Sequence, residues 1–335
     1  MNKTMENYPY VSIIIPTLNE EKYIRNCLNS VFGQTYPSAK FEIFVIDGES
    51  CDKTVELVKE FQINHSNLFL LNNKKKIQSA AFNMGLDYSK GEIIIRLDAH
   101  CTYESNYILY SVEDHLESEF GNVGGHWSVL PGSDTLTAKA IAIINTSNFW
   151  LGGATYRVGR IRKLTDSVPF GAFPKKVISI VGKMKEDLPR GEDNEYNSRI
   201  RKAGFKILFD PRIVAYYYSR QNLKSFLKQM YDNGFSIGVL IRTYINAISL
   251  RHIAPLLFVL ILILGTLTSL FLPPIWTFII IVLLVYFALN LIFGIKTVSV
   301  KEIKLIPIII IAVFFVHIYY GIGTIHGLVK GKYFN

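Results

Sequence analysis

The sequence predicts an α/β domain with a mostly parallel sheet, followed by amphipathic helices and a C-terminal membrane region. Two observations lead to this fold class. Short apolar runs alternate with segments of helical periodicity in the N-terminal third of the chain, which is the pattern of βαβ units. Three uncharged stretches near the end, at residues 253–272, 275–295 and 305–325, are each long enough to cross a bilayer.

The first strand is expected at Val11–Ile15, where Pro16 ends it because proline fixes φ and lacks an N–H donor. Thr17 and Asn19 then offer caps for a helix that runs to about Phe32. The same alternation continues, with strands expected at residues 41–46, 67–71 and 92–97 and helices ending near residues 61 and 88.

Polar residues follow three of these strands. Thr17 and Glu20 come after the first, Asp47 after the second, and Asp98 and His100 after the fourth. Because α/β sheets bind ligands at the carboxyl ends of their strands, we expect these side chains at one edge of the sheet. The turn after the first strand has no glycine, which argues against a dinucleotide fingerprint.

Asp98 and His100 are two residues apart, so an extended backbone projects them to the same side. A carboxylate and an imidazole that converge there could hold a divalent cation, and the cation could hold a diphosphate. The alternative is that Asp98 caps the next helix and His100 is merely a polar surface residue.

The net charge of +9 is concentrated near the C-terminus. Residues 1–215 carry 26 Lys and Arg against 25 Asp and Glu, whereas residues 216–335 carry 10 against 2. Because the excess lies in the membrane half, it indicates attraction to anionic lipid rather than nucleic-acid binding. No secretory signal opens the chain and its three cysteines are scattered, so we expect a cytoplasmic N-terminal domain without a disulfide framework.

These patterns predict three regions: a cytoplasmic domain over residues 1–218, amphipathic interfacial helices over 219–252, and a transmembrane region over 253–335. Positive charges flank the first two apolar stretches on one side, which predicts a multi-pass protein of the plasma membrane. The third stretch either spans, which places Lys330 and Lys332 outside, or does not fully cross.

Three segments, Val11–Glu20, Ile46–Thr54 and Arg96–His100, resemble the motifs of family 2 glycosyltransferases in their order and spacing. The likeness is nearest to the membrane-bound transferases of exopolysaccharide synthesis, of the succinoglycan ExoA type. It implies a Rossmann-like GT-A catalytic fold. It departs from the family at Glu49, where the family often has glycine.

The resemblance also implies roles for individual residues. The nucleotide pocket would be lined by Pro16, Thr17, Glu20, Asp47, Lys76, Gln78 and Asp98. Asp47 would accept a hydrogen bond from the base, most simply the uracil N–H. Asp98 and His100 would bind Mg²⁺ or Mn²⁺ on the diphosphate.

The second half of the site would come from the middle of the chain. Residues Asn122–Trp127 resemble the strand where the family lodges the donor sugar, and a glycine at Gly125 would let backbone approach a ligand closely. A β-bulge or turn at a sheet edge is the alternative. After a helix expected at Thr135–Trp150, basic residues could clamp a phosphate on a lipid carrier or form a solvated face: Arg157, Arg160, Arg162 and Lys163. Gln229 lies where related enzymes have a glutamine on the acceptor side.

The segment Leu188–Tyr196 resembles the family's Glu-Asp motif, in which the second acidic residue is the general base. Here that residue is Asp193, with Glu192 and Glu195 in support. Transfer with inversion needs a base to take the proton of the acceptor hydroxyl. The alternative is ordinary capping, because acidic residues stabilise helix N-termini by roughly 0.3–1 kcal/mol.

The sequence therefore predicts an inverting, metal-dependent glycosyltransferase that moves a sugar from a nucleotide-sugar, expected to be UDP-linked, to a polyprenyl-diphosphate-linked saccharide. Its partners would be that donor, the polyprenyl-linked acceptor and membrane lipids, with no nucleic acid. A polyprenyl-phosphate monosaccharide synthase is the alternative within this class. A non-catalytic membrane scaffold is the alternative outside it.

Overall fold

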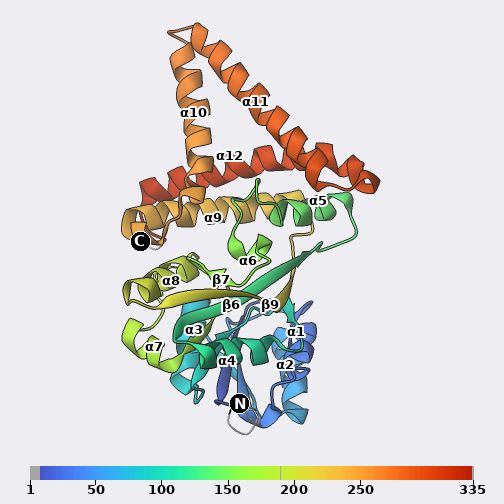
Figure 1. Cartoon of the computed structure of the whole chain (residues 1–335), viewed down its shortest axis with the longest axis vertical. Helices are drawn as coiled ribbons and strands as arrows, with labels where there is room; N and C mark the ends of the chain where they lie inside the picture. Colours follow the sequence, from blue (N-terminus) through green and yellow to red (C-terminus); the bar gives the residue numbers. More distant parts are fainter. Residues whose placement is uncertain (1–7, 189, 334–335) are drawn as a thin grey trace. The chain divides into compact units, whose positions relative to one another are not determined.

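The computed structural model describes residues 8–188 and 190–333, drawn in Figure 1. The chain forms two compact units. The sheet unit contains the residues up to Ser128 together with Gly159–Tyr217, and the helical unit contains Val129–Val158 and the residues from Tyr218 onward.

A nine-stranded mixed sheet organises the fold, with its strands in the order β3-β2-β1-β4-β8-β6-β9-β5 and with β7 paired to β9. The first four strands are mutually parallel, whereas β8 pairs antiparallel to β4. The strands are β1 (Val11–Thr17), β2 (Phe41–Asp47), β3 (Leu68–Asn72), β4 (Ile93–Arg96), β5 (Cys101–Tyr103), β6 (Phe120–Leu130), β7 (Lys163–Leu164), β8 (Ala172–Pro174) and β9 (Lys206–Tyr218). The predicted α/β class is confirmed.

The parallel strands are the centre of the core. Every residue of β1 and β2 is buried, as expected for apolar runs covered on both faces. The helices of the sheet unit are α1 (Ile24–Phe32), α2 (Thr54–Asn64), α3 (Gln78–Tyr88), α4 (Tyr107–Glu117), α7 (Lys175–Val181) and α8 (Glu192–Lys202).

Two predicted boundaries at the start of the chain are wrong. Pro16 does not end β1, because the strand continues beside β2 with Pro16 opposite Ile46, past the last residue of β1 that pairs with β4. Helix α1 begins at Ile24 rather than beside Asn19. Asn19 has φ +57° and binds the turn after β2 instead, accepting a hydrogen bond from the Cys51 N–H at 2.9 Å.

The helical unit contains the long apolar helices. Its members are α5 (Leu136–Asn145), α6 (Thr155–Val158), α9 (Leu223–Thr243), α10 (Ala254–Ser269), α11 (Pro274–Thr297) and α12 (Ile306–Lys330). Helix α5 ends five residues before the predicted Trp150, which is instead a buried core residue. Within residues 8–188 and 190–333, three helical segments are long and apolar enough to cross a membrane. Figure 1 shows α10 and α11 as a hairpin that rises away from α9 and α12.

Candidate active site

The carboxyl ends of β1 and β2 bring Thr17 and Asp47 together. The two residues are opposite each other in the parallel register, and the Thr17 hydroxyl donates to Asp47 Oδ1 at 3.4 Å. Asp47 is 5% exposed and also accepts from Ser50, from its backbone N–H at 2.9 Å and its hydroxyl at 2.6 Å. The predicted nucleotide-binding aspartate is therefore held in one orientation at the edge of the sheet.

The backbone around this edge adopts unusual conformations. Asn19, Glu49 and Lys76 have φ of +57°, +60° and +58°, a region that costs non-glycine residues about 1–3 kcal/mol and that clusters at functional sites. The Lys76 ammonium pairs with the Glu49 carboxylate at 2.9 Å. Because glycine adopts this φ readily, the conformation explains why a glycine suits the position of Glu49.

Arg96, the last residue of β4, connects the two acidic motifs. Its guanidinium pairs with Asp193 and with Glu192 at 3.3 Å through Nη1, and with Asp98 at 3.1 Å through Nη2. Nη2 also donates to Gln78 Oε1 at 3.2 Å. Four residues that the sequence assigned to the site thus converge on one arginine. Of the three carboxylates, Asp193 is the most accessible, at 33% exposure of its side chain.

The charges in this cluster perturb one another. Burial and the charge of Asp193 raise the pKa of Glu192 to about 7, although Arg96 opposes the shift. Burial also raises the pKa of Asp193, again against the effect of Arg96. Burial works against the charge of Arg96, but the carboxylates of Asp193, Asp98 and Glu192 together raise its pKa. A carboxylate with a raised pKa is suited to taking a proton near neutral pH.

His100 lies between Asp98 and Glu20. Its Nδ1 is 3.1 Å from Glu20 Oε1, and its Nε2 is 3.9 Å from Asp98 Oδ2. The backbone N–H of Glu20 is fixed by the Thr54 hydroxyl at 2.7 Å. Carboxylate and imidazole ligands together suit Mn²⁺ and, through the oxygen, Mg²⁺. Across residues 8–188 and 190–333, no three His, Cys, Asp or Glu side chains are grouped so as to hold a metal alone.

An aromatic stack borders His100. Trp127 of β6 lies between Phe170 and Tyr217, with ring centroids at 4.7 and 4.9 Å, and Tyr217 in turn meets the His100 ring edge-on at 5.6 Å. Tyr217 thus links the predicted donor-sugar residue Trp127 to the predicted metal ligand His100.

The structure requires a glycine at position 125 for a different reason from the one expected. A Cβ at Gly125 would lie 1.7 Å from the Ile213 carbonyl oxygen of β9, so the space is filled by neighbouring backbone rather than left for a ligand. The alternative of an edge bulge does not hold either, because β6 lies between β8 and β9.

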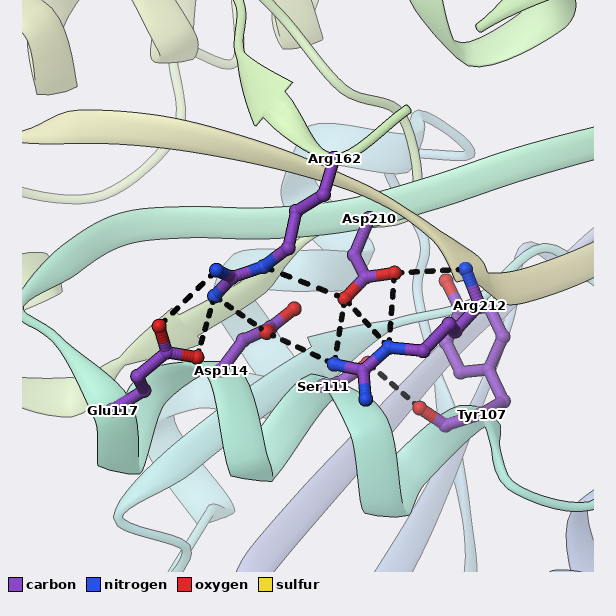
Figure 2. A network of polar contacts seen from close by, with 7 residues as sticks. All are labelled: Tyr107, Ser111, Asp114, Glu117, Arg162, Asp210 and Arg212. Carbon is purple, nitrogen blue, oxygen red and sulfur yellow. Dashed lines mark hydrogen bonds and ion pairs between the residues drawn. The ribbon is translucent and has the colours of Figure 1, made fainter. Parts of the chain in front are cut away.

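The basic run is divided among three environments. Arg162 is part of an ion-pair network with Asp114 at 3.0 Å, Glu117 at 2.7 Å and Asp210 at 3.6 Å (Figure 2). Its guanidinium is thereby committed to the sheet unit, and the expected phosphate clamp loses this member. Arg160 lies 3.4 Å from His126 Nε2 in the same unit.

Arg157 and Gln229 belong to the helical unit. Arg157 Nη1 donates to Asn145 Oδ1 at 3.2 Å, which ties α6 to the end of α5. Gln229 lies partly buried on α9.

Comparison with known proteins decides the family. The family described as "Glycosyl transferase family 2" matches residues 12–179. The chain belongs to this family. It is therefore a glycosyltransferase that uses a nucleotide-sugar donor, and this part of the predicted function is confirmed.

Two curated family 2 relatives are similar over most of their length. The chain is 33% identical over 241 residues to dolichyl N-acetyl-alpha-D-glucosaminyl phosphate 3-beta-D-2,3-diacetamido-2,3-dideoxy-beta-D-glucuronosyltransferase of Methanococcus voltae, covering 70% of this chain and 74% of that protein. It is 28% identical over 228 residues to the succinoglycan biosynthesis protein ExoA of Rhizobium meliloti, covering 66% and 67%. The predicted ExoA likeness is confirmed.

Among solved structures, the mannosyltransferase PcManGT from Pyrobaculum calidifontis, in complex with GDP-Man and Mn²⁺, superimposes with a TM-score of 0.61. The match covers 96% of this chain and 88% of that chain at 17% identity, so it shows the shared fold alone.

Sequence reasoning named Arg96 within a motif but gave it no role. The available signal was a cation that directly follows the apolar run Ile93–Ile95, because a buried charge has to be paired. The aromatic partners Phe170 and Tyr217 carried no such signal, since each is one of many aromatic residues in this family 2 chain.

Proposed function

We propose that this family 2 enzyme is an inverting, metal-dependent transferase that moves a sugar from a UDP-linked donor to a polyprenyl-diphosphate-linked saccharide. The observation that carries the proposal is the convergence of Asp98 and Asp193 on Arg96. A donor-side carboxylate and a candidate base, 95 positions apart in the sequence, lie within one ion-pair cluster. A scaffold has no use for such an arrangement.

In the proposed reaction the acceptor hydroxyl oxygen bonds to the anomeric carbon while the bond from that carbon to the diphosphate oxygen breaks. The hydroxyl proton passes to the Asp193 carboxylate, and the nucleoside diphosphate leaves. A divalent cation held by Asp98 and His100 would stabilise the negative charge of the leaving group. Arg96 keeps the Asp193 carboxylate oriented until the acceptor arrives.

The hydrogen-bonding capacity of Asp47 favours a donor with a uracil base. Its oxygens already accept from Ser50 and Thr17, but each carboxylate oxygen has more than one lone pair. The carboxylate can therefore also accept from the N–H of a base at the edge of the sheet. Lys76 lies next to the residue that follows Asp47, because its Cα would be 3.5 Å from a Cβ added at Gly48. Its ammonium supplies positive charge on the phosphate side.

The acceptor proposal is supported by the relative from Methanococcus voltae, which is named for transfer to a dolichyl phosphate-linked sugar. The three long apolar segments and the basic C-terminal part of this chain favour a membrane-bound acceptor. We place the catalytic domain on the cytoplasmic side, where positively charged flanks are expected.

Nucleoside-diphosphate release by the purified full-length protein tests the proposal. The panel contains UDP-, GDP- and dTDP-sugars with Mn²⁺, each with a polyprenyl phosphate or a polyprenyl-diphosphate sugar. Release from a UDP-sugar that requires the polyprenyl-diphosphate sugar supports the proposal. Chelator should abolish this release, and Asp193→Asn should slow it strongly. Asp87→Asn is a matched control, since Asp87 is an exposed carboxylate that pairs with Lys183.

The alternatives give different outcomes in the same assay. A polyprenyl-phosphate monosaccharide synthase would respond to the bare polyprenyl phosphate and depend less on Asp193, because a phosphate oxygen needs no base. A scaffold would bind no donor and release no nucleotide.

A further inference from the structure

Helices α9 and α12 pack along their whole length as a parallel pair. A Cβ added at Gly234 would lie 2.0 Å from the Tyr320 carbonyl oxygen, and one at Gly327 would lie 2.1 Å from that of Phe235. Residues later in α9 contact residues later in α12, so the two helices run in the same direction. Near their ends, Arg242 Nη1 donates to the Leu328 carbonyl at 3.1 Å.

The beginnings of the two helices are joined as well. One buried cluster contains residues from both helices: Phe226, Leu227 and Met230 of α9 with Ile309, Ala312, Val313 and Val316 of α12. The two helices therefore share one orientation relative to a bilayer, and whatever prevents α9 from crossing also prevents α12.

Helix α9 carries charges that the hydrocarbon would not accept. Lys228 has 75% of its side chain exposed, and its partner Asp232 has 37%. Lys224 and Arg242 are exposed near the two ends of the helix. If α12 crossed the bilayer, its parallel neighbour would bring the Lys228–Asp232 pair to hydrocarbon depth, where charged side chains are strongly disfavoured.

The apolar character of α12 has another explanation. One face is covered by α9 and the core. The opposite side exposes a stripe of apolar residues in which the exposed His326 lies between the last two members: Ile311, Phe315, Tyr319, Ile322 and Val329. A helix that is apolar all round is one that is buried on all sides. Here protein covers one side, and a lipid surface fits the other.

We infer that, of the three apolar segments, α10 and α11 cross the bilayer and α12 lies along its surface with this stripe against the lipid. In Figure 1 the α10–α11 hairpin rises from α9 and α12 instead of running beside them. The inference rests on the proposed membrane insertion but not on the proposed chemistry. It goes beyond the sequence, which left open whether residues 305–325 span.

The flanking charges agree with this placement. With two spans, Lys330 and Lys332 lie on the same side as Arg251 and Lys296. All four basic residues then face the cytoplasm. A third span would instead place Lys330 and Lys332 outside.

Labelling of cysteines with a membrane-impermeant maleimide tests the topology in intact cells. Phe271→Cys and Lys332→Cys are each made with Cys51→Ser, because Cys51 is exposed whereas Cys27 and Cys101 are buried. Phe271 is 84% exposed in the α10–α11 turn. We expect labelling of Phe271→Cys in intact cells, and labelling of Lys332→Cys, like that of native Cys51, only after permeabilisation.

Two outcomes overturn the inference: labelling of Lys332→Cys in intact cells, or protection of Phe271→Cys. Nucleotide release by the same variants is measured separately, so a failure of the topology is distinguished from a failure of the proposed reaction.

A second measurement examines α12 directly. Spin labels at Ile311→Cys and Val329→Cys, in vesicles of phosphatidylcholine and phosphatidylglycerol, report depth through collisions with oxygen and with a polar relaxing agent. A spanning helix would separate the two positions by about 27 Å at 1.5 Å per residue. We expect nearly equal depths, and a separation near the larger value contradicts the inference.

Discussion

Replacing Arg96 with methionine should destabilise the sheet unit strongly. The guanidinium is 3% exposed and pairs with Asp98, Glu192 and Asp193. Methionine removes the charge while keeping an unbranched chain, so three carboxylates lose their shared cation. Removing one partner from a buried ionic group costs about 3–5 kcal/mol. In a unit of this size each 1 kcal/mol lowers the melting temperature by about 2–4 °C, so we expect a decrease of about 6–20 °C.

Arg162→Met is the matched control. Arg162 also pairs with three carboxylates, but its side chain is 36% exposed. Arg212 remains in place to pair with Asp114 at 3.4 Å and Asp210 at 2.7 Å, as Figure 2 shows. Of the three partners of Arg162 only Glu117 is exposed, but Arg212 still compensates the buried Asp114 and Asp210, so the control should lose less than Arg96→Met.

The pH dependence separates lost charge from lost packing. Without Arg96 the pKa values of Glu192 and Asp193, which burial already raises against the effect of Arg96, rise further, so the folded state binds protons more tightly. Its stability is then retained at low pH and lost as the pH rises through the folded pKa values. Thermal melts in detergent at pH 5.5 and pH 8 should show the deficit of Arg96→Met shrinking at the lower pH. An equal deficit at both values, or one no larger than that of Arg162→Met, would refute the reasoning.

Four further outcomes are expected. The pKa of Glu192 is about 7 in the folded chain and about 4.3 when unfolded, so this group lowers the free energy of unfolding as the pH rises between those values. Glu192→Gln should make the melting temperature depend less on pH in that range. Asp193→Asn should lower kcat on the order of 100-fold with an unchanged KM for the donor, and an unchanged kcat argues for a phosphate acceptor. Asp98→Asn should raise the Mn²⁺ concentration needed for half-maximal nucleotide release, whereas an unaltered requirement would place the metal elsewhere. Gly125→Ala should prevent folding because of the contact with Ile213, whereas Gly204→Ala, with φ +89° and no atom within 4 Å of the added Cβ, should cost only about 1–2 kcal/mol; similar losses would contradict the packing argument.

The sequence predicted the elements whose signal is local. The buried runs at β1, β2 and β4 were placed within two residues because burial on both faces leaves a continuous apolar stretch. The site residues Thr17, Asp47 and Asp98 followed from the ends of those strands, because the topology of parallel sheets brings such ends to one edge.

The roles of three residues could not be predicted from the sequence, because their partners lie far away along the chain. Asn19 looked like a helix cap, but the turn at Ser50 and Cys51 holds it in a left-handed conformation. Gly125 looked like room for a ligand until β9 was seen to fill it. The role of Arg96 depends on Glu192 and Asp193, nearly 100 residues away, and no local pattern reports such a pairing.

The pairing of α9 with α12 also sets an order of events during synthesis. Arg242 binds a carbonyl 86 positions later in the chain, so α9 cannot complete this packing until α12 has been made. A ribosome that stops within α11 leaves the face of α9 that packs on α12 uncovered beside an inserted hairpin. Contacts of such long separation form slowly, so a chain that lacks α12 would offer proteases a helix α9 without this packing partner.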